Sequence, residues 1–336
     1  MKIEDNVELK PYNTFGLMST AGHLIRIYSE TEIFEVIAEN LSPIRIIGGG
    51  SNILLTGDVN GYVLKNEIKG IEIVDEDEEK VLVRAGAGEI WNTLVLWSVS
   101  HGLGGLENLI LIPGTVGAAP IQNIGAYGVE QKNAFHSLSA IDLETGEKVV
   151  FYKHQCQFGY RDSIFKNEAK DRYFITHVHY VLLKKNPLTL EYGDIKKVLL
   201  EKNISDPTLD DVASAISTIR KSKLPDPAVI GNAGSFFKNP VIDQQKFMKL
   251  REIYPDLPSF QIEDSRFIKI PAAWLIEKSG FKGLKINNIG VHEKQALVLV
   301  NHGGGSGQEI YLLSNKIQSK VKTMFDITLH PEVNIW

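Results

Sequence analysis

The chain has only one cysteine, Cys156, in 336 residues. A single thiol cannot form a disulfide within the chain, and it excludes the cysteine clusters that bind zinc or iron–sulfur groups. No apolar run approaches the ~18 residues of a membrane-spanning helix, and residues 1–10 lack the pattern of a signal peptide. We therefore expect a cytoplasmic protein with no membrane insertion and no metal site.

A surplus of basic residues is missing as well. The 36 Lys and Arg residues face 41 Asp and Glu residues, which gives a net charge of −5. General nucleic-acid binders carry a positive surplus, so nucleic acid is not an expected partner. An anionic ligand must instead meet locally placed cations. The apolar fraction of 43% is that of an ordinary globular protein, and the length predicts two or three domains.

Glycine, alanine and proline are concentrated in residues 113–128, PGTVGAAPIQNIGAYG, which include no charged residue. Gly117, Ala118 and Ala119 allow another molecule to approach the main chain, whose N–H groups can cradle a phosphate. Gln122 and Asn123 add amide groups suited to the edge of a heteroaromatic ring. A tightly packed joint between a helix and a loop is the alternative interpretation of this stretch.

Two other glycine-rich segments fit the standard nucleotide-binding motifs poorly. The strand expected over 44–47 runs into residues 48–52, GGGSN, but no helical pattern follows and the third glycine of G-x-G-x-x-G would fall at Ile53. A Rossmann fold is therefore not expected. The loop can bind phosphate through main-chain N–H groups, and a plain turn explains it equally well. Residues 302–307 lack the lysine of a phosphate loop, because Gln308 stands in its place, so we predict a flexible connection there.

Hydrophobic periodicity predicts helices and strands in segregated segments. A capping box of Ser29 and Glu32 marks the start of the first helix. Helices are expected over 31–40, 89–101, 206–224, 243–254, 272–279 and from the 302–307 loop to about residue 324. Strands are expected over 24–28, 44–47, 71–74, 81–85, 137–152, 173–183 and 296–300.

Three short stretches combine reactive side chains with tight turns. Arg161 follows Tyr160 in residues 158–163, and its guanidinium fork suits a carboxylate. Ser235 stands on a predicted glycine turn, residues 231–239, and Glu332 follows a proline near the end of the chain. Taken singly, each stretch is more often a surface turn than a site. The G-x-S-x-G frame of a serine hydrolase is absent around Ser235.

Together these segments resemble the MurB family, the UDP-N-acetylenolpyruvoylglucosamine reductases. The matches follow the family order across nearly the whole chain, and residues 190–194 look like the tyrosine-bearing insertion of the type I subgroup. The matching segments are residues 13–16, 48–52, 113–128, 160–163, 223–227, 231–240 and 331–333.

The resemblance implies an α+β flavoprotein of three domains, with FAD held non-covalently in a non-Rossmann fold of the PCMH/VAO type. The first FAD-binding subdomain would comprise residues 1–66 with 331–336 returning to it, the second 67–218, and the α+β substrate-binding domain 219–330. By resemblance, the residues that contact FAD are Gly48, Gly49, Gly50, Ser51, Asn52, Pro113, Gly114, Val116, Gly117, Ile121, Gln122, Asn123, Gly125 and Tyr127.

The implied reaction is the NADPH-dependent reduction of UDP-N-acetylglucosamine enolpyruvate to UDP-N-acetylmuramate, a step of peptidoglycan precursor synthesis. Arg161 and Glu332 would stabilise negative charge on the enolpyruvyl carboxylate, and Ser235 would donate a proton to C2. The residues that match substrate contacts are Tyr160, Tyr192, Lys223, Asn239, Lys282 and Gln295.

Two alternatives belong to other functional classes. A flavin-binding or UDP-sugar-binding module without turnover would keep the glycine segments, but it would not need Arg161, Ser235 and Glu332 together. An FAD oxidase of similar fold would carry a covalent flavin on a His or Cys near the glycine loops. His101 and Cys156 fall outside the usual loop.

Overall fold

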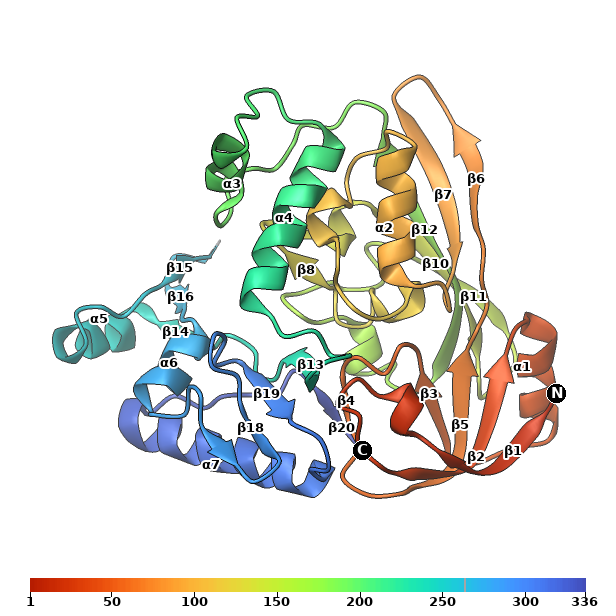
Figure 1. Cartoon of the computed structure of the whole chain (residues 1–336). Helices are drawn as coiled ribbons and strands as arrows, with labels where there is room; N and C mark the ends of the chain where they lie inside the picture. The colour runs from red at the N-terminus through yellow and green to blue at the C-terminus, as the bar shows by residue number, and fades with distance from the viewer. Residues whose placement is uncertain (263) are drawn as a thin grey trace. The chain divides into compact units, whose positions relative to one another are not determined.

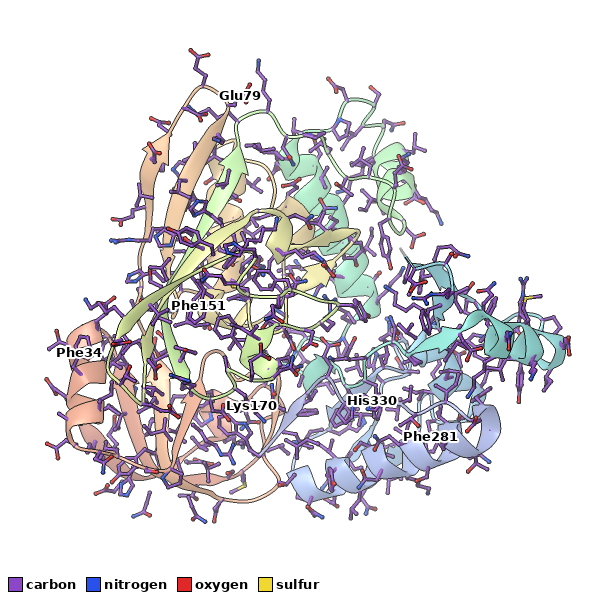
Figure 2. The ribbon with its side chains drawn as sticks, turned by 180° about the vertical axis from the view of Figure 1, so that it is seen from behind. Phe34, Glu79, Phe151, Lys170, Phe281 and His330 are labelled. Carbon is purple, nitrogen blue, oxygen red and sulfur yellow. The ribbon has the colours of Figure 1, made fainter. Side chains whose placement is uncertain are left out.

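The structure is a computed structural model that describes residues 1–262 and 264–336. The chain divides into two compact units, each built from three segments (Figure 1). Unit 1 comprises Met1–Val7, Ala21–Gly50 and Val59–Ser222, and unit 2 comprises Glu8–Thr20, Ser51–Asp58 and Lys223–Trp336. Each unit has a hydrophobic core of its own. Phe151 lies among the side chains of unit 1 and Phe281 among those of unit 2 (Figure 2).

One sheet of unit 1 contains parallel strands. Its order is β1 (Ile3–Glu8), β2 (Thr20–Ile27), β5 (Val59–Asn66) and β3 (Ile44–Ile47), and β5 pairs in parallel with both β2 and β3. Helix α1 (Glu30–Ala38) begins with the predicted capping box of Ser29 and Glu32. Its buried side chains Ile33 and Val36 join Ile25 and Ile27 of β2 in one hydrophobic cluster. Helix α1 therefore packs on this sheet.

The second sheet of unit 1 is antiparallel throughout. Its order is β11 (Lys148–Tyr152), β10 (Phe135–Asp142), β12 (Tyr173–Leu183), β7 (Lys80–Gly86) and β6 (Ile71–Glu76). The hairpin predicted over 71–85 is therefore confirmed, and both of its strands extend further than expected.

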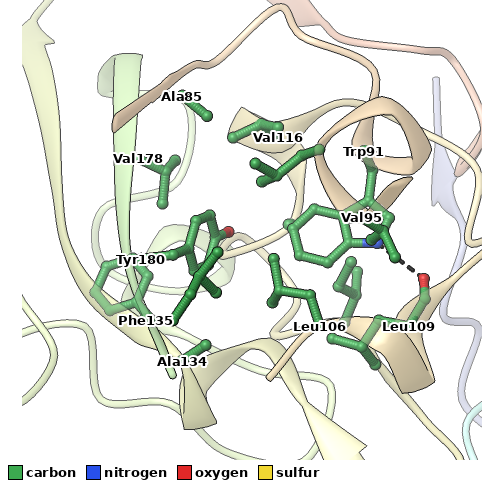
Figure 3. Packing of buried hydrophobic residues seen from close by; sticks show 14 of the residues in the cluster. Ala85, Trp91, Val95, Leu106, Leu109, Val116, Ala134, Phe135, Val178 and Tyr180 are labelled. Carbon is green, nitrogen blue, oxygen red and sulfur yellow. Dashed lines mark hydrogen bonds between the residues drawn. The ribbon is translucent and has the colours of Figure 1, made fainter. Parts of the chain in front are cut away.

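Three helices bury apolar side chains in the main core of unit 1. They are α2 (Trp91–Ser100), α3 (Ile195–Glu201) and α4 (Leu209–Lys223). Trp91 packs edge-on against Tyr180 of β12, with ring centroids 5.8 Å apart, and its Nε1 donates to the carbonyl of Leu109 at 3.0 Å (Figure 3). This core supports the 3-10 turn η2 (Glu107–Leu109), which precedes the small-residue stretch 113–128, and the 3-10 turn η3 (Val116–Ala118), which lies within it.

Residues 113–128 therefore form the turn η3 followed by the first strand of a short hairpin. Strands β8 (Gly125–Ala126) and β9 (Val129–Glu130) pair antiparallel, and Tyr127 and Gly128 form the loop with φ of 49° and 82°. Positive φ at both loop positions is the geometry of a type I′ turn. The remaining elements of unit 1 are η4 (Gln131–Asn133) and η5 (Ile164–Lys166).

In its described residues, unit 2 combines two small antiparallel sheets and a two-stranded parallel sheet with three helices. One antiparallel sheet has the order β13 (Gly231–Ser235), β19 (Val298–Asn301), β18 (Ile289–Val291), β17 (Lys285–Ile286), and the other β14 (Val241–Asp243), β16 (Phe267–Lys269), β15 (Phe260–Gln261). The helices are α5 (Gln244–Ile253), α6 (Ala272–Lys278) and α7 (Gly307–Phe325). Strand β20 (Asn334–Ile335) pairs in parallel with β4 (Ile53–Leu54). The 3-10 turn η1 (Lys10–Tyr12) lies in the first segment of unit 2, Glu8–Thr20.

Two local predictions in unit 2 are wrong. The glycine turn expected over 231–239 begins as strand β13, and Gly234, with φ of 69°, lies at a register shift between Asn232 and Ser235. The glycine therefore supports a bulge within a strand. The connection at 302–307 is held rather than flexible, since the N–H groups of Gly303 and Gly305 each donate to Oδ1 of Asn301 at 3.0 Å.

No helix in the described part of the chain is both long and apolar enough to cross a membrane.

Candidate active site

Two glycine segments that are far apart in the sequence meet in unit 1. A Cβ placed on Gly48 would lie 2.4 Å from Oγ1 of Thr115, and one placed on Gly49 would lie 2.9 Å from Cα of Gly114. Both distances are below van der Waals contact, so only glycine permits this approach. The structure thus joins the two segments that the sequence singled out separately, in close main-chain contact.

The neighbouring small residues at 117–119 serve packing instead. The N–H groups of Gly117, Ala118 and Ala119 donate to the carbonyls of Ala87, Thr115 and Val116 at 2.8, 3.1 and 3.2 Å. A Cβ on Gly117 would also lie 2.6 Å from Cβ of Ala87. The expectation of free N–H groups for a phosphate is wrong at these three residues, and the alternative of a packed joint is correct for them.

The guanidinium of Arg161 points at residues 123–125, in the second half of the 113–128 stretch. Arg161 has φ of 54° and lies in a turn closed by a hydrogen bond of 3.0 Å from the N–H of Gly159 to the carbonyl of Asp162. Its Nη1 donates to the carbonyl of Asn123 at 3.3 Å and its Nη2 to the carbonyl of Gly125. The structure therefore brings the predicted catalytic cation to the predicted flavin segment. The guanidinium carbon also lies 5.5 Å from the ring centroid of Tyr160.

Tyr192 lies beside the tip of the β8–β9 hairpin. A Cβ on Gly128 would lie 3.3 Å from Cβ of Tyr192. Asn108 connects the hairpin tip to the segment that precedes Tyr192. Its Nδ2 donates to the carbonyl of Tyr127 at 3.0 Å and to that of Thr189 at 2.9 Å. Tyr192 is 47% exposed, so the predicted insertion holds its phenol against the site segment and in contact with solvent.

In unit 2 residues 330–332 lie beside the segment that follows strand β13. The N–H of Glu332 donates to the carbonyl of Phe236 at 2.8 Å, and the N–H of Lys238 donates to the carbonyl of His330 at 2.9 Å. Because Phe236 follows Ser235, these bonds place the predicted proton donor and the predicted carboxylic acid on adjacent segments.

Asn52 belongs to the same part of unit 2. Its Nδ2 donates to the carbonyl of Glu332 at 3.2 Å, and its own carbonyl accepts from the N–H of Asn334 at 3.0 Å. The 48–52 loop is thus divided, since Gly50 ends a segment of unit 1 and Ser51 begins a segment of unit 2.

The predicted substrate contacts Lys223, Asn239, Lys282 and Gln295 all lie in unit 2. Oδ1 of Asn239 accepts from the N–H of Ala272 at 2.9 Å and thereby caps α6. Nζ of Lys282 lies 3.0 Å from Oε1 of Glu277, which orients the ammonium group. Ser51, Asn52, Ser235 and Glu332 also lie in unit 2, and unit 1 carries the remaining predicted site residues, namely Gly48 to Gly50, those of 113–127, Tyr160, Arg161 and Tyr192.

Buried ionisable groups lie outside these segments as well. Burial raises the pKa of the Cys156 thiol to about 12, so this thiol stays protonated and unreactive. Burial lowers the pKa values of His177 and His179 on β12, which keeps both imidazoles neutral near pH 7. Among the described residues, no group of three or more His, Cys, Asp or Glu side chains is placed to hold a metal ion.

Arg220 of α4 is a site candidate that the sequence did not reveal. Its guanidinium is largely buried, which lowers its pKa, while the Tyr127 phenol raises it, and Nη2 donates to the carbonyl of Leu111 at 3.2 Å. No sequence signal marks it, because it falls in a helix with two other cations, Lys221 and Lys223.

Comparison with known proteins matches both units. Residues 29–151 match an FAD binding domain family, and residues 226–336 match the C-terminal domain of UDP-N-acetylenolpyruvoylglucosamine reductase. A protein of that name from Flavobacterium johnsoniae is 47% identical over 337 residues and is covered fully, as is this chain. The Pseudomonas aeruginosa protein of the same name is 48% identical over 339 residues, covering 100% of this chain and 99% of its own.

A solved structure shows the same fold. The crystal structure of UDP-N-acetylenolpyruvylglucosamine reductase (MurB) from Thermus caldophilus superposes with a TM-score of 0.69 at 24% identity, covering 100% of this chain and 99% of that one. The predicted α+β flavoprotein fold with a non-Rossmann FAD-binding domain is confirmed. With full-length identities near one half, this chain belongs to the UDP-N-acetylenolpyruvoylglucosamine reductase family.

Proposed function

We propose that the protein reduces the enolpyruvyl group of UDP-N-acetylglucosamine enolpyruvate to give UDP-N-acetylmuramate, with NADPH as the reductant and non-covalent FAD as the cofactor. FAD supplies the transfer of two electrons between NADPH and the enolpyruvyl double bond. The observation that carries the proposal is the main-chain hydrogen bond from Glu332 to Phe236, the residue after Ser235, because it supports a role for Ser235 and Glu332 in one site. The reaction belongs to peptidoglycan precursor synthesis in the cytoplasm.

Arg161 is the residue that we assign to charge stabilisation. Hydride addition at C3 of an enol ether is difficult, because that carbon is electron-rich. The addition becomes possible when the adjacent carboxylate accepts negative charge, which a fixed guanidinium stabilises. The two carbonyls that accept from Arg161, those of Asn123 and Gly125, fix the guanidinium before substrate binds. Glu332 in its protonated form would donate a second hydrogen bond to the same carboxylate.

Ser235 is the residue that we assign to protonation of C2. A serine hydroxyl is a weak acid, so it can protonate only a strongly basic centre such as an enediolate-like carbon. The bulge at Gly234, which has φ of 69°, departs from the regular register of β13 immediately before Ser235. Lys223 and Lys282 would bind the substrate diphosphate, with Tyr160, Tyr192, Asn239 and Gln295 as further contacts.

The close approach of 48–49 to 114–115 supports the assignment of FAD to these segments, because it brings together two glycine-rich stretches whose main-chain N–H groups can bind phosphate. We assign the FAD contacts to Gly48 through Asn52 and to the residues of 113–127 named above, with Asn123 limited to its main chain because its side-chain amide is fully hydrogen-bonded within the protein. We also propose the division into an FAD-binding subdomain of 1–66 with 331–336, a second of 67–218, and a substrate-binding domain of 219–330.

The absorption spectrum of the purified protein tests the function. We expect a flavin spectrum that NADPH bleaches without oxygen and that the enolpyruvyl substrate restores. Acid precipitation should release the flavin into the supernatant. Flavin that stays with the polypeptide would support the oxidase alternative, and failure of the substrate to restore the spectrum would support a binding module.

A further inference from the structure

Asn123 stands at the centre of a buried polar network around the guanidinium of Arg161. Its side chain is fully buried, and all four hydrogen-bonding positions of the amide are used within unit 1. Nδ2 donates to Oε2 of Glu130 and to the carbonyl of Gly159, both at 2.9 Å. Oδ1 accepts from Nε2 of Gln131 at 3.3 Å and from the N–H of Lys132 at 3.2 Å. A saturated amide has no group left for a cofactor or substrate.

The partners also determine which way the amide faces. A carboxylate and a carbonyl only accept, so Glu130 and Gly159 require the NH2 group. The N–H of Lys132 only donates, so it requires the oxygen. The orientation of Asn123 is therefore set by the chemistry of its neighbours.

The network holds Arg161 at both ends. The Asn123 amide binds the carbonyl of Gly159, in the turn that carries Arg161, while the main-chain carbonyl of Asn123 accepts from the tip of the Arg161 guanidinium at 3.3 Å. Asn123 thus fixes both the main-chain turn that carries Arg161 and the guanidinium of Arg161. Gly125 completes the arrangement, because a Cβ there would lie 2.9 Å from Nη1 of Arg161.

The network is anchored in the core of unit 1. Oε1 of the buried Gln131 accepts from the hydroxyl of Tyr180 at 3.3 Å, and Tyr180 lies on the central strand β12. A buried hydrogen-bonded chain of this kind holds its members in one arrangement, because breaking any link leaves an unpaired polar group.

We propose that Asn123 is a positioning residue for Arg161, and this inference rests on the proposed function of Arg161. Its amide holds the guanidinium where charge develops on the substrate carboxylate, and it contacts neither substrate nor cofactor. A displacement near 1 Å at a charge-stabilising group costs about 10²-fold in rate. The effect of losing Asn123 therefore falls on substrate reduction at saturation more than on substrate binding.

Asn123→Asp tests the inference with almost no change of shape. The new carboxylate oxygen faces Glu130 and the carbonyl of Gly159, so two attractions become repulsions. We expect substrate reduction, measured as the return of flavin absorbance, to slow about 10- to 100-fold at saturating substrate, with a much smaller change in KM. Glu130→Gln is the matched control, because it keeps an acceptor oxygen for the amide, and it should change the rate by less than about threefold.

The double variant Asn123→Asp with Glu130→Gln supplies the rescue. The Gln amide can donate to the new carboxylate, so one of the two lost bonds returns with reversed polarity. We expect part of the lost rate to return. A rate no better than that of the single aspartate variant would overturn the inference. If the aspartate variant does not fold, Asn123→Ala replaces it in the same comparison.

Arg161→Lys separates this inference from the proposed function. If Asn123 acts only through Arg161, adding Asn123→Asp to Arg161→Lys should slow the reaction by less than about twofold further. Equal slowing in both backgrounds would overturn the inference while the function stands. Normal turnover of Arg161→Lys would overturn the catalytic role of Arg161 itself.

Nitrogen NMR of the arginine side chains gives a readout independent of turnover. Two carbonyl bonds hinder rotation of the Arg161 guanidinium, so its two Nη atoms should give separate signals, which Arg161→Lys identifies by their loss. These signals should merge in Asn123→Asp. Separate signals in that variant would contradict the positioning role.

Discussion

The main-chain N–H of Glu332 donates a hydrogen bond of 2.8 Å to the carbonyl of Phe236. This bond joins the segment that follows β13 to residues near 332, and it holds the main chain of Glu332 beside that of Phe236, the residue after Ser235. The isolated bridge between Phe237 and Pro331 and the bond from Lys238 to His330 continue the same contact. Changes in either segment should therefore affect both assigned groups.

The role of Ser235 is tested by Ser235→Ala and Ser235→Cys. The alanine variant should bind FAD and be bleached by NADPH, whereas substrate reduction should slow by about 10²–10⁴-fold, the usual contribution of a positioned acid. The cysteine variant should recover part of the rate, because a thiol also donates a proton. Rapid mixing of reduced enzyme with saturating substrate measures the step, and fast reoxidation of the alanine variant would exclude the proton-donor role.

Tyr192→Phe tests the phenol that lies beside the Gly128 hairpin tip. If the hydroxyl binds the substrate diphosphate, its loss should raise KM about tenfold or more, since a hydrogen bond to a charged group contributes about 1.5–3 kcal/mol. Bleaching by NADPH should change far less. Tyr152→Phe is a matched control, since Tyr152 is 49% exposed and Tyr192 is 47% exposed. Steady-state kinetics of the two variants that do not differ would remove Tyr192 from the substrate site.

Gly48→Ala and Gly49→Ala test the crossing of the two glycine segments. Each new Cβ meets an atom closer than contact distance, 2.4 Å at Gly48 and 2.9 Å at Gly49. Overpacking of this kind costs about 1–3 kcal/mol, so both variants should lose thermal stability and bind FAD more weakly. The two clashes differ in kind. The first is with the side chain of Thr115 and the second with the backbone of Gly114.

Thr115→Ala should therefore rescue Gly48→Ala and leave Gly49→Ala unrescued. Melting temperatures and FAD titrations of the two single and two double variants make the comparison. Equal behaviour of both glycine variants in the Thr115→Ala background would contradict the crossing geometry.

Asp326→Asn tests how much the charge of Asp326, at the end of α7, contributes to the stability of the fold. Hydrogen bonds from Lys246 and Lys322 lower the pKa of Asp326 from 3.8 to about 2. A carboxylate whose folded pKa is depressed stabilises the fold above its unfolded pKa, and this contribution is lost as the pH falls through the folded value. Asn also tolerates the left-handed conformation of residue 326, where φ is 53°.

The asparagine variant should therefore unfold at lower denaturant concentration at pH 7, and the difference should shrink between pH 4 and pH 2. Chemical denaturation at several pH values measures this. A difference that stays constant across the range would assign the effect to something other than the charge.

Local sequence signals predict secondary structure correctly where that structure depends on residues close together in the sequence. The capping box of Ser29 and Glu32 starts α1 as expected, because both bonds form within one turn. The 71–85 hairpin likewise depends on alternation in two adjacent runs. Strand β13 was missed because its glycines indicate a turn, and only pairing with β19, far along the chain, makes them a bulged strand.

The candidate site, too, could be predicted from the sequence only in part. Motif order indicated the family and the site residues, which remain proposals for this chain. The use of each main-chain group was not predictable, because it depends on contacts between distant segments. The N–H groups at 117–119 looked free in sequence and are used by Ala87, Thr115 and Val116, and the amide of Asn123 looked available and is saturated.

The pairing of β20 with β4 bears on how the protein is made. Residues 53–54 leave the ribosome early, and their partners at 334–335 are synthesised much later. The carbonyl of Trp336 accepts from the N–H of Thr56 at 2.9 Å, so Trp336 also takes part. Domains generally fold as units during synthesis, but unit 2 can be completed only after residues 334–336 have left the ribosome. A chain truncated in the last turn of α7 would have an unpaired β4 and would lack Glu332.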